Sequence, residues 1–487
     1  MPTTEDRLVM SADAALDAIA AFGPALDRAH ALACDYLASL PTRPVSRVVA
    51  PEAMAAALDE PLPERGCAPE RAVAEWFNRA EAGIVASQGP RYFGFVTGGS
   101  TPAALAGDWL ASALDQNAGL WMTSPAAAQT ELTVLRWLKD LFGLPAGWAG
   151  ALTSGATMAN LVGLAAARQW AGERLGFDPA ADGLAGRPPI PVLSSTEIHA
   201  SARKSLAALG LGRDAGRRLP APAGALDLDA LDAAMTETSG PVIVVANAGE
   251  VNTGAFDDLS AIADRCARHV GGAWLHVDGA FGLFAAIAPS HAHLVGGIER
   301  ADSVAADGHK WLNVPYDSGF AFVRDEVALR AAFATTAAYL TPSGGEVAAW
   351  DPLSHVPEMS RRFRGLAAWC ALRAAGREGY RALVERSLAN AAAFAEWVAG
   401  EPGIELAAPA PLNIVCFRYA LPGATPEAAD TANRSAVAAL QAGGRVFVSG
   451  TVWEGRAAIR AAFDNWSTGP ADVAILQEAV AAVRPGR

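Results

Sequence analysis

The sequence predicts an α/β protein with a large, mainly parallel, doubly wound domain, a helical segment before it and a smaller α+β domain after it. Short apolar runs alternate with helical patterns through residues 150–325, which is typical of parallel sheets covered by helices. A chain of 487 residues is also too long for one compact core. We expect a helical segment over residues 1–88, the large domain over 89–365 and the small domain over 366–487.

The two flanking parts have different patterns. Before the large domain, periodic Ala- and Leu-rich segments at 12–40 and 68–87 predict helices, and a Pro-rich stretch separates them. After it, helical patterns alternate with strand-like runs at 413–419, 445–450 and 456–464. This mixture predicts the α+β character of the C-terminal domain.

The bulk composition excludes several classes of protein. Hydrophobic residues make up 52% of the chain and the net charge is −13, so we expect a buried core and neither nucleic acid nor anionic membrane as a partner. Acidic residues stand where a signal peptide needs basic ones, and no apolar run is long enough to span a bilayer, so a cytoplasmic enzyme is expected. The five cysteines include no CxxC pair, and we expect no disulfide framework and no metal site.

Two residues of opposite charge follow predicted buried strands: Asp278 after residues 273–277, and Lys310 after residues 303–306. A buried lysine is costly unless it is paired or neutralised. Only three of the 38 Lys and Arg residues are lysines, so position 310 favours an amine that arginine cannot supply. A lysine that forms a Schiff base, near an aspartate that keeps a pyridinium nitrogen protonated, is the arrangement that pyridoxal 5'-phosphate (PLP) requires.

The segments HVDGA (276–280) and DGHKW (307–311) resemble the group II PLP-dependent decarboxylases, a family that includes aromatic-L-amino-acid and glutamate decarboxylases. The resemblance extends over about residues 75–465. It implies fold-type I architecture and a homodimer with a shared active site. In that dimer the N-terminal helical segment packs on the partner subunit, and a loop of one subunit closes the other's site.

The resemblance also implies the residues that hold PLP. Small and hydroxyl residues at 153–157 lead into a helix, whose N-terminus suits an anion, although an N-cap alone would explain them. His199 would stack on the cofactor ring, Ala280 would lie beneath it, and His309 would help to hold the phosphate. The predicted cofactor-binding residues are Thr153, Ser154, His199, Asp278, Ala280, His309 and Lys310.

The reaction implied is loss of CO2 from an L-amino acid, giving an amine. The bond held perpendicular to the cofactor ring breaks, and a carboxylate held there beside His199 would leave. Tyr339, in a Pro- and Gly-rich loop, would return a proton to the carbon; a packing role at the base of this loop stays open. The predicted catalytic residues are Lys310, His199, Tyr339 and Asp278.

Aromatic residues suggest an aromatic substrate. The family lines its side-chain pocket with the stretches that correspond to residues 89–110 and to the segment around residue 121. A hydrophobic loop that caps a core would also explain these residues. The predicted pocket residues are Tyr92, Phe93, Phe95 and Trp121.

Two departures from the family pattern bear on the site. Glu250 stands where a threonine is common in the family, so a hydroxyl that could touch the cofactor or the substrate is missing. Acidic and aliphatic amino acids therefore stay open as alternative substrates. Asp307 stands where asparagine is common. Because an ionised carboxylate would repel a phosphate, we expect Asp307 to orient His309 or another donor.

Three other functions are considered. Aldehyde synthases share the scaffold, but they commonly carry phenylalanine at the loop position where this chain has Tyr339. Carbon–carbon lyases that act on phosphorylated lipids should carry a second phosphate site, and no basic cluster suggests one. A non-catalytic PLP-binding protein should lose His199 or Tyr339, and both are present.

Overall fold

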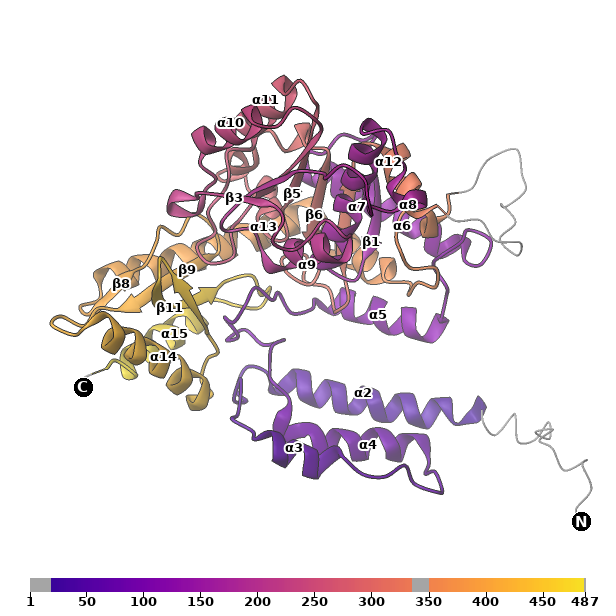
Figure 1. The fold of residues 1–487 in the computed structure, drawn as a ribbon. Helices are drawn as coiled ribbons and strands as arrows, with labels where there is room; N and C mark the ends of the chain where they lie inside the picture. Colours follow the sequence, from indigo (N-terminus) through magenta and orange to yellow (C-terminus); the bar gives the residue numbers. More distant parts are fainter. Residues whose placement is uncertain (1–18, 335–349, 486–487) are drawn as a thin grey trace, which may run out of the picture.

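The computed structural model describes residues 19–334 and 350–485 (Figure 1). Tyr339 lies outside these residues, so its predicted role stays a prediction. Within the described ranges no helix has the length and apolar character needed to cross a membrane.

The large domain is built on a seven-stranded sheet with the order β1-β7-β6-β5-β4-β2-β3. The pairs from β3 to β6 are all parallel, and β7 runs antiparallel to both β1 and β6. This confirms the prediction of a mainly parallel α/β sheet. The strands are β1 (Ala149–Thr153), β2 (Val192–Ser195), β3 (Arg217–Leu219), β4 (Val242–Asn247), β5 (Ala273–Asp278), β6 (Ser303–Asp307) and β7 (Gly319–Val323).

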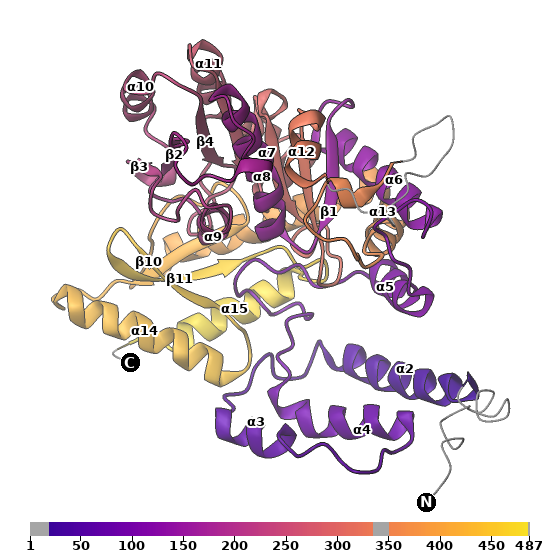
Figure 2. The same cartoon turned by 45° about the vertical axis from the view of Figure 1, so that its right-hand side comes forward.

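Helices cover both faces of this sheet (Figures 1 and 2). In β4, Val242 and Val244 belong to one hydrophobic cluster, and Ile243 and Val245 to another. Strands buried on both faces need such continuous apolar runs, which is why these segments carry no alternation of apolar and polar residues. One cluster includes α7 (Ala156–Arg174), α9 (Ala200–Ala208) and α12 (Glu326–Phe333), and the other α6 (Pro125–Phe142), α10 (Leu228–Thr236), α11 (Leu259–Arg268) and part of α13 (Gly365–Gly400).

The small domain holds a four-stranded antiparallel sheet with the order β10-β11-β9-β8. The predicted runs at 413–419 and 456–464 become β9 and β11. The run at 445–450 forms an isolated bridge between Phe447 and Tyr92, and its last two residues begin β10. The elements are β8 (Ile404–Leu406), β9 (Ile414–Tyr419), β10 (Ser449–Trp453), β11 (Arg456–Ala462), α14 (Pro426–Gly443) and α15 (Pro470–Ala482).

Helix α13 joins the two domains. It packs on α5 (Pro102–Leu114) and α6 and ends beside β8, β9 and α15. Gly376 interrupts it with φ 61°, a conformation that glycine adopts without strain.

The N-terminal segment folds as α2 (Phe22–Ser39), α3 (Pro51–Leu58) and α4 (Pro69–Ala80), which stand apart from the large domain in both views (Figures 1 and 2). The remaining short helices are α8 (Pro179–Asp182), η1 (Glu81–Gly83), η2 (Pro222–Gly224), η3 (Gly282–Ile287), η4 (Ala292–Val295), η5 (Ile298–Arg300) and η6 (Pro352–Ser354).

Candidate active site

The predicted site residues meet at one edge of the large sheet. Thr153 and Asp278 end strands β1 and β5, Lys310 lies three residues after β6, and His199 caps α9 after β2. Ligands bind at this edge of open α/β sheets. A cavity of about 400 Å³ opens there, and its lining includes Ser154, His199, Ala280, His309 and Lys310. Asp278 lines a smaller adjoining cavity together with His199, Ala280 and Lys310.

Lys310 is held from two sides. Its Nζ lies 3.0 Å from Oδ2 of Asp307, so its ammonium is paired in this state. On the backbone side, Gly98 donates its N–H to the carbonyl of His309 at 3.1 Å. A Cβ at Gly98 would lie 1.8 Å from the carbonyl oxygen of Lys310, so only glycine permits this approach.

Asp307 contacts the helix that follows the predicted phosphate-binding segment. Its Oδ1 accepts a hydrogen bond from the backbone N–H of Ala156, at the N-terminus of α7, while its Oδ2 pairs with Lys310. A carboxylate at a helix N-terminus is favourable. Asp307 therefore links the lysine to the place where an anion would bind.

His309 is oriented mainly by other groups than Asp307. Its Nδ1 lies 3.1 Å from the carbonyl oxygen of Ser318, which can only accept, so Nδ1 donates. Its ring stacks on Tyr316 at 4.3 Å. The nearest Asp307 oxygen lies 3.6 Å from Nε2, and burial lowers the pKa of His309 below the ordinary value.

His199 has a defined hydrogen-bonding side. The backbone N–H of Ser201 donates to Nδ1 at 3.2 Å, and Oγ of Ser201 lies 2.6 Å from the same nitrogen. Burial lowers the pKa of His199, which favours the neutral imidazole near neutral pH. Since Nδ1 accepts, the ring hydrogen lies on Nε2.

Asp278 is buried and fully bonded. Its Oδ1 accepts from the backbone N–H of Ala280 at 3.2 Å, and its Oδ2 accepts from Nδ2 of Asn160 at 2.8 Å. Sequence reasoning missed Asn160. The available signal was an amide in the first half of an Ala-rich helix that directly follows the predicted phosphate loop.

Thr153 is fully buried and does not line the main cavity; its Oγ1 donates to the carbonyl of Gly155 at 3.0 Å. It therefore shapes the turn from β1 into α7. Ser154 and residues 155–157 line the cavity.

The four aromatic pocket candidates do not line either cavity at Lys310 within the described chain. Tyr92 stacks on Phe447 of the small domain at 4.8 Å, and Phe93 is buried in the small-domain core. Phe95 is 59% exposed, and Trp121 lies elsewhere, with its backbone N–H bonded to Asp351. Their role in substrate binding stays a prediction.

Glu250 closes its own loop. Its Oε1 accepts from the backbone N–H of Asn252 at 2.7 Å and its Oε2 from that of Thr253 at 2.9 Å. Burial raises its pKa. The small domain holds the same loop, because Thr451 donates to Oδ1 of Asn252 at 2.6 Å and Arg460 donates to the carbonyl of Val251.

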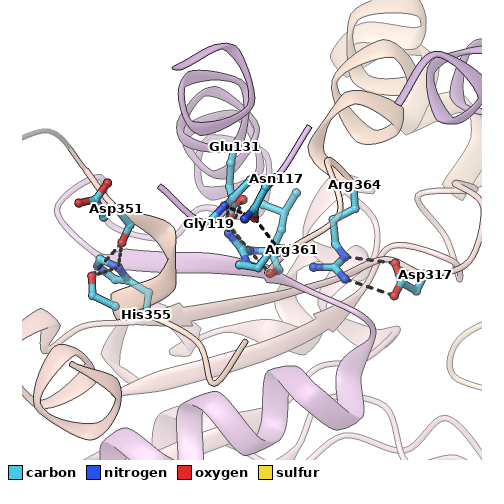
Figure 3. Close-up of polar contacts among 11 residues, drawn as sticks. Asn117, Gly119, Glu131, Asp317, Asp351, His355, Arg361 and Arg364 are labelled. Carbon is cyan, nitrogen blue, oxygen red and sulfur yellow. Dashed lines mark hydrogen bonds and ion pairs between the residues drawn. The ribbon is translucent and has the colours of Figure 1, made fainter. Parts of the chain in front are cut away.

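A buried ion pair fixes β1 just before Thr153 (Figure 3). The guanidinium of Arg361 bonds both carboxylate oxygens of Glu131, at 2.9 and 3.0 Å, and the carbonyl of Leu152 at 2.6 Å. Glu131 in turn accepts from the backbone N–H of Leu152 at 2.8 Å. Figure 3 also shows Arg364 paired with Asp317, at 3.1 Å, so both arginines have structural contacts within one chain.

These groups fit PLP. The cavity offers a lysine amine, a helix N-terminus with backbone N–H groups for a phosphate, and a small residue, Ala280. The adjoining cavity adds the carboxylate of Asp278, which suits a pyridinium nitrogen. Within the described ranges, no group of three or more His, Cys, Asp and Glu side chains is arranged to hold a metal ion.

Comparison with known proteins gives the same cofactor. The model of the pyridoxal-dependent decarboxylase conserved domain matches residues 51–420. Tryptophan decarboxylase 1 from Oryza sativa subsp. japonica is 31% identical over 88% of this chain and 86% of its own length. L-2,4-diaminobutyrate decarboxylase from Rhizobium meliloti is 34% identical over 82% of this chain and 78% of its own.

Among solved structures, that of Oryza sativa TDC with PLP and tryptamine superposes with a TM-score of 0.88 and 29% identity, and it covers 98% of this chain and 99% of that one. Fold, site chemistry and sequence thus agree. The chain belongs to the family of pyridoxal-dependent decarboxylases, which are fold-type I, PLP-dependent carboxy-lyases.

Proposed function

We propose that this protein decarboxylates an L-amino acid, with aromatic ones favoured, to the amine and CO2, using PLP bound to Lys310 as a Schiff base. The observation that carries the proposal is the convergence of Lys310, His199 and Asp278 on adjoining cavities at one sheet edge. Bound PLP supplies an electron-withdrawing ring that stabilises negative charge on the substrate α-carbon.

The residues of the chain have distinct tasks in this proposal. Asp278 holds the proton on the cofactor ring nitrogen. The N-terminus of α7 would hold the phosphate together with His309, whose Nε2 can donate only in the protonated imidazolium because Nδ1–H already bonds the carbonyl of Ser318. Lys310, which pairs with Asp307 here, would supply the amine. His199 presents its Nε2–H toward the substrate carboxylate and favours the orientation in which CO2 leaves.

We assign to Tyr339 the return of a proton to the substrate α-carbon after CO2 leaves. A second tyrosine, Tyr316, also lines the main cavity and is 63% exposed. The two are separable: Tyr339→Phe should shift products from amine toward aldehyde and ammonia, whereas Tyr316→Phe, which keeps the ring stacked on His309, should not.

An aromatic substrate is supported by the similarity to a tryptophan decarboxylase and to a structure that holds tryptamine. The diaminobutyrate decarboxylase is a relative of comparable identity, so a panel of substrates is needed. Glu250 does not argue for a basic substrate, because all its hydrogen bonds lie within its own loop.

We also propose a homodimer with a shared active site. Helices α2 and α4 carry an apolar groove that includes Leu32, Val73 and Trp76, and Trp76 is 58% exposed; Phe22, the first residue of α2, is 68% exposed. A patch of this kind marks an interface. Analytical ultracentrifugation should give the dimer mass, and a chain without residues 1–88 should sediment as a monomer.

The test is CO2 release from purified protein with added PLP, measured against aromatic, acidic, aliphatic and basic L-amino acids, with Lys310→Ala as control. CO2 and the matching amine, both dependent on Lys310, are expected. CO2 with an aldehyde and ammonia would replace the proposal by an aldehyde synthase. A lysine-dependent cofactor absorption band without CO2 from any substrate would refute decarboxylation.

A further inference from the structure

Behind Asp278 and His199 lies a chain of buried polar side chains centred on Asn160 of α7. Asn160, His276 and Ser303 are each 0% exposed. Polar groups buried this deeply stabilise a fold only when all their hydrogen bonds are made. The direction of each bond therefore follows from the chemistry of its neighbours.

The orientation of the Asn160 amide follows from Asp278. A carboxylate only accepts, so the atom 2.8 Å from Oδ2 of Asp278 is the amide nitrogen, Nδ2. The amide oxygen then faces Nε2 of His276 at 2.8 Å, and this nitrogen must donate.

His276 completes the chain on the far side. Burial lowers its pKa to about 4, so it is neutral and its other nitrogen, Nδ1, accepts. The donor to Nδ1 is Oγ of Ser303, at 2.8 Å, which in turn accepts from Nε1 of Trp274 at 2.8 Å. The indole can only donate, so the chain runs in one direction from Trp274 to Asn160.

The second amide hydrogen of Asn160 points to a different residue. Nδ2 lies 3.2 Å from Oγ of Ser201, which is thereby an acceptor and is free to donate its own hydrogen to Nδ1 of His199 at 2.6 Å. One amide thus makes three bonds, to His276, Asp278 and Ser201. These bonds reach Asp278, proposed to contact the cofactor ring nitrogen, and, through Ser201, His199, proposed to contact the substrate carboxylate.

We propose that Asn160 is a positioning residue that acts on both Asp278 and His199: one amide hydrogen keeps the Asp278 carboxylate an acceptor for the ring nitrogen, and the other, through Ser201, keeps the His199 hydrogen on Nε2. This inference rests on the proposed function for its kinetic consequence only. Its effect on the cofactor ring nitrogen needs PLP binding but no turnover.

The variant Asn160→Leu keeps the branching and the number of heavy atoms of the side chain, is larger, and removes both amide hydrogens. Asp278 then loses a charge-assisted hydrogen bond, and this loss changes the strength of its interaction with the protonated nitrogen of the cofactor ring. The matched control is Asn433→Leu in the small domain. Asn433 is also buried, accepts from the N–H of Tyr419 at 2.8 Å and donates to the carbonyls of Tyr419 and Ala429.

The first readout is nitrogen NMR of the holoenzyme loaded with PLP labelled at the ring nitrogen, followed with pH and without substrate. Asn160→Leu should change the pH at which the ring nitrogen loses its proton, and Asn433→Leu should not. The second readout is kcat/KM against pH, for which Asn160→Leu should fall about 10–100-fold, as for other residues that orient a ligand-binding side chain.

Ser201→Ala removes the hydroxyl that links Asn160 to His199 and leaves the backbone N–H of residue 201 as the remaining donor to Nδ1. It should leave the ring-nitrogen signal unchanged and alter the pH profile of kcat/KM. The charged groups acting on His199 are Asp278, Lys310, Asp307 and Arg460, none of which this variant changes.

Asn160→Asp, which has the same shape, serves if Asn160→Leu does not fold; its carboxylate would oppose Asp278 and also change the ring-nitrogen signal. A wild-type signal in these Asn160 variants, or a wild-type pH profile in Ser201→Ala, would overturn the corresponding half of the inference. A wild-type enzyme that binds PLP but releases no CO2 would end the proposed function, and the NMR comparison would still decide the role of Asn160.

Discussion

Replacing Asp464 with asparagine should make the protein more stable, and increasingly so as the pH rises. Asp464 follows β11 and is 1% exposed. Its Oδ2 has no hydrogen-bond partner among the described residues. Burial raises its pKa from 3.8 to about 7, although Lys310, the backbone N–H of Thr97 and Arg460 act in the opposite direction.

The sign and size of the effect follow from these two pKa values. Between pH 4 and 7 the native protein binds a proton at Asp464 that the unfolded chain has lost, so stability falls as the pH rises. At 1.36 kcal/mol per unit, the penalty is about 2 kcal/mol at pH 5 and reaches ~4 kcal/mol above pH 7. With an unfolding entropy of about 2.1 cal/mol/K per residue over 487 residues, Asp464→Asn should raise the unfolding temperature by about 2 °C at pH 5 and 4 °C at pH 8.

The assay is thermal unfolding of cofactor-free protein at both pH values, with Asp257→Asn as the matched control. Asp257 is also buried and its pKa is raised to about 6, but each of its oxygens accepts a backbone N–H, from Leu226 and from Asn247, at 2.7 Å. An amide nitrogen there would face a donor and cost ~1–3 kcal/mol. The reasoning is wrong if Asp464→Asn lowers the unfolding temperature, or if its gain is the same at pH 5 and pH 8.

Three further predictions follow from buried contacts. Arg361→Met or Glu131→Leu alone should lose about 3–5 kcal/mol of unfolding free energy, because each single change leaves one charge buried and unpaired. The double variant should lose less than either single variant. Urea titration of all three variants measures these losses. His276 has a pKa of about 4 in the folded protein, where it is neutral, and of 6.5 in the unfolded chain. Acidification from pH 6.5 to 4 should therefore remove ~3 kcal/mol of unfolding free energy. His276→Gln should abolish this loss, as measured by urea titration at several pH values. Gly98→Ala should displace the backbone of Lys310 and weaken the lysine-dependent cofactor absorption band, whereas an alanine at exposed Gly23, where a Cβ meets nothing within 4 Å, should leave it intact.

Much of the fold was predictable because the central strands β4, β5 and β6 are short, mostly apolar runs that each end in a polar residue, whereas β3 (Arg217–Leu219) has no such run. Asp278 and Lys310 could be assigned to one edge for the same reason, since parallel strands end together. Asn160 could not be found this way. It lies in the interior of α7, where only the packing of the helix on β5 shows that its amide faces Asp278.

Partners of charged groups were harder to predict than their positions. Asp307 was expected to orient His309 or another donor. The donors that it bonds are Lys310, three residues away, and the backbone N–H of Ala156, whereas Nε2 of His309 lies 3.6 Å away. The aromatic residues show the same limit. Tyr92 and Phe93 lie a few residues before Gly98, which contacts the backbone of Lys310, but they pack on the small domain, since hydrophobicity alone does not say which of two cores receives a side chain.

The loop that carries Glu250 has a consequence for how this enzyme can be rebuilt. Thr451 and Arg460, both in the small domain, hold that loop through Asn252 and Val251, yet neither lines the cavities at Lys310. The small domain is therefore not an exchangeable module. A chimaera that takes its C-terminal region from a relative would keep a well-formed cavity only if the donor region supplies the same two contacts.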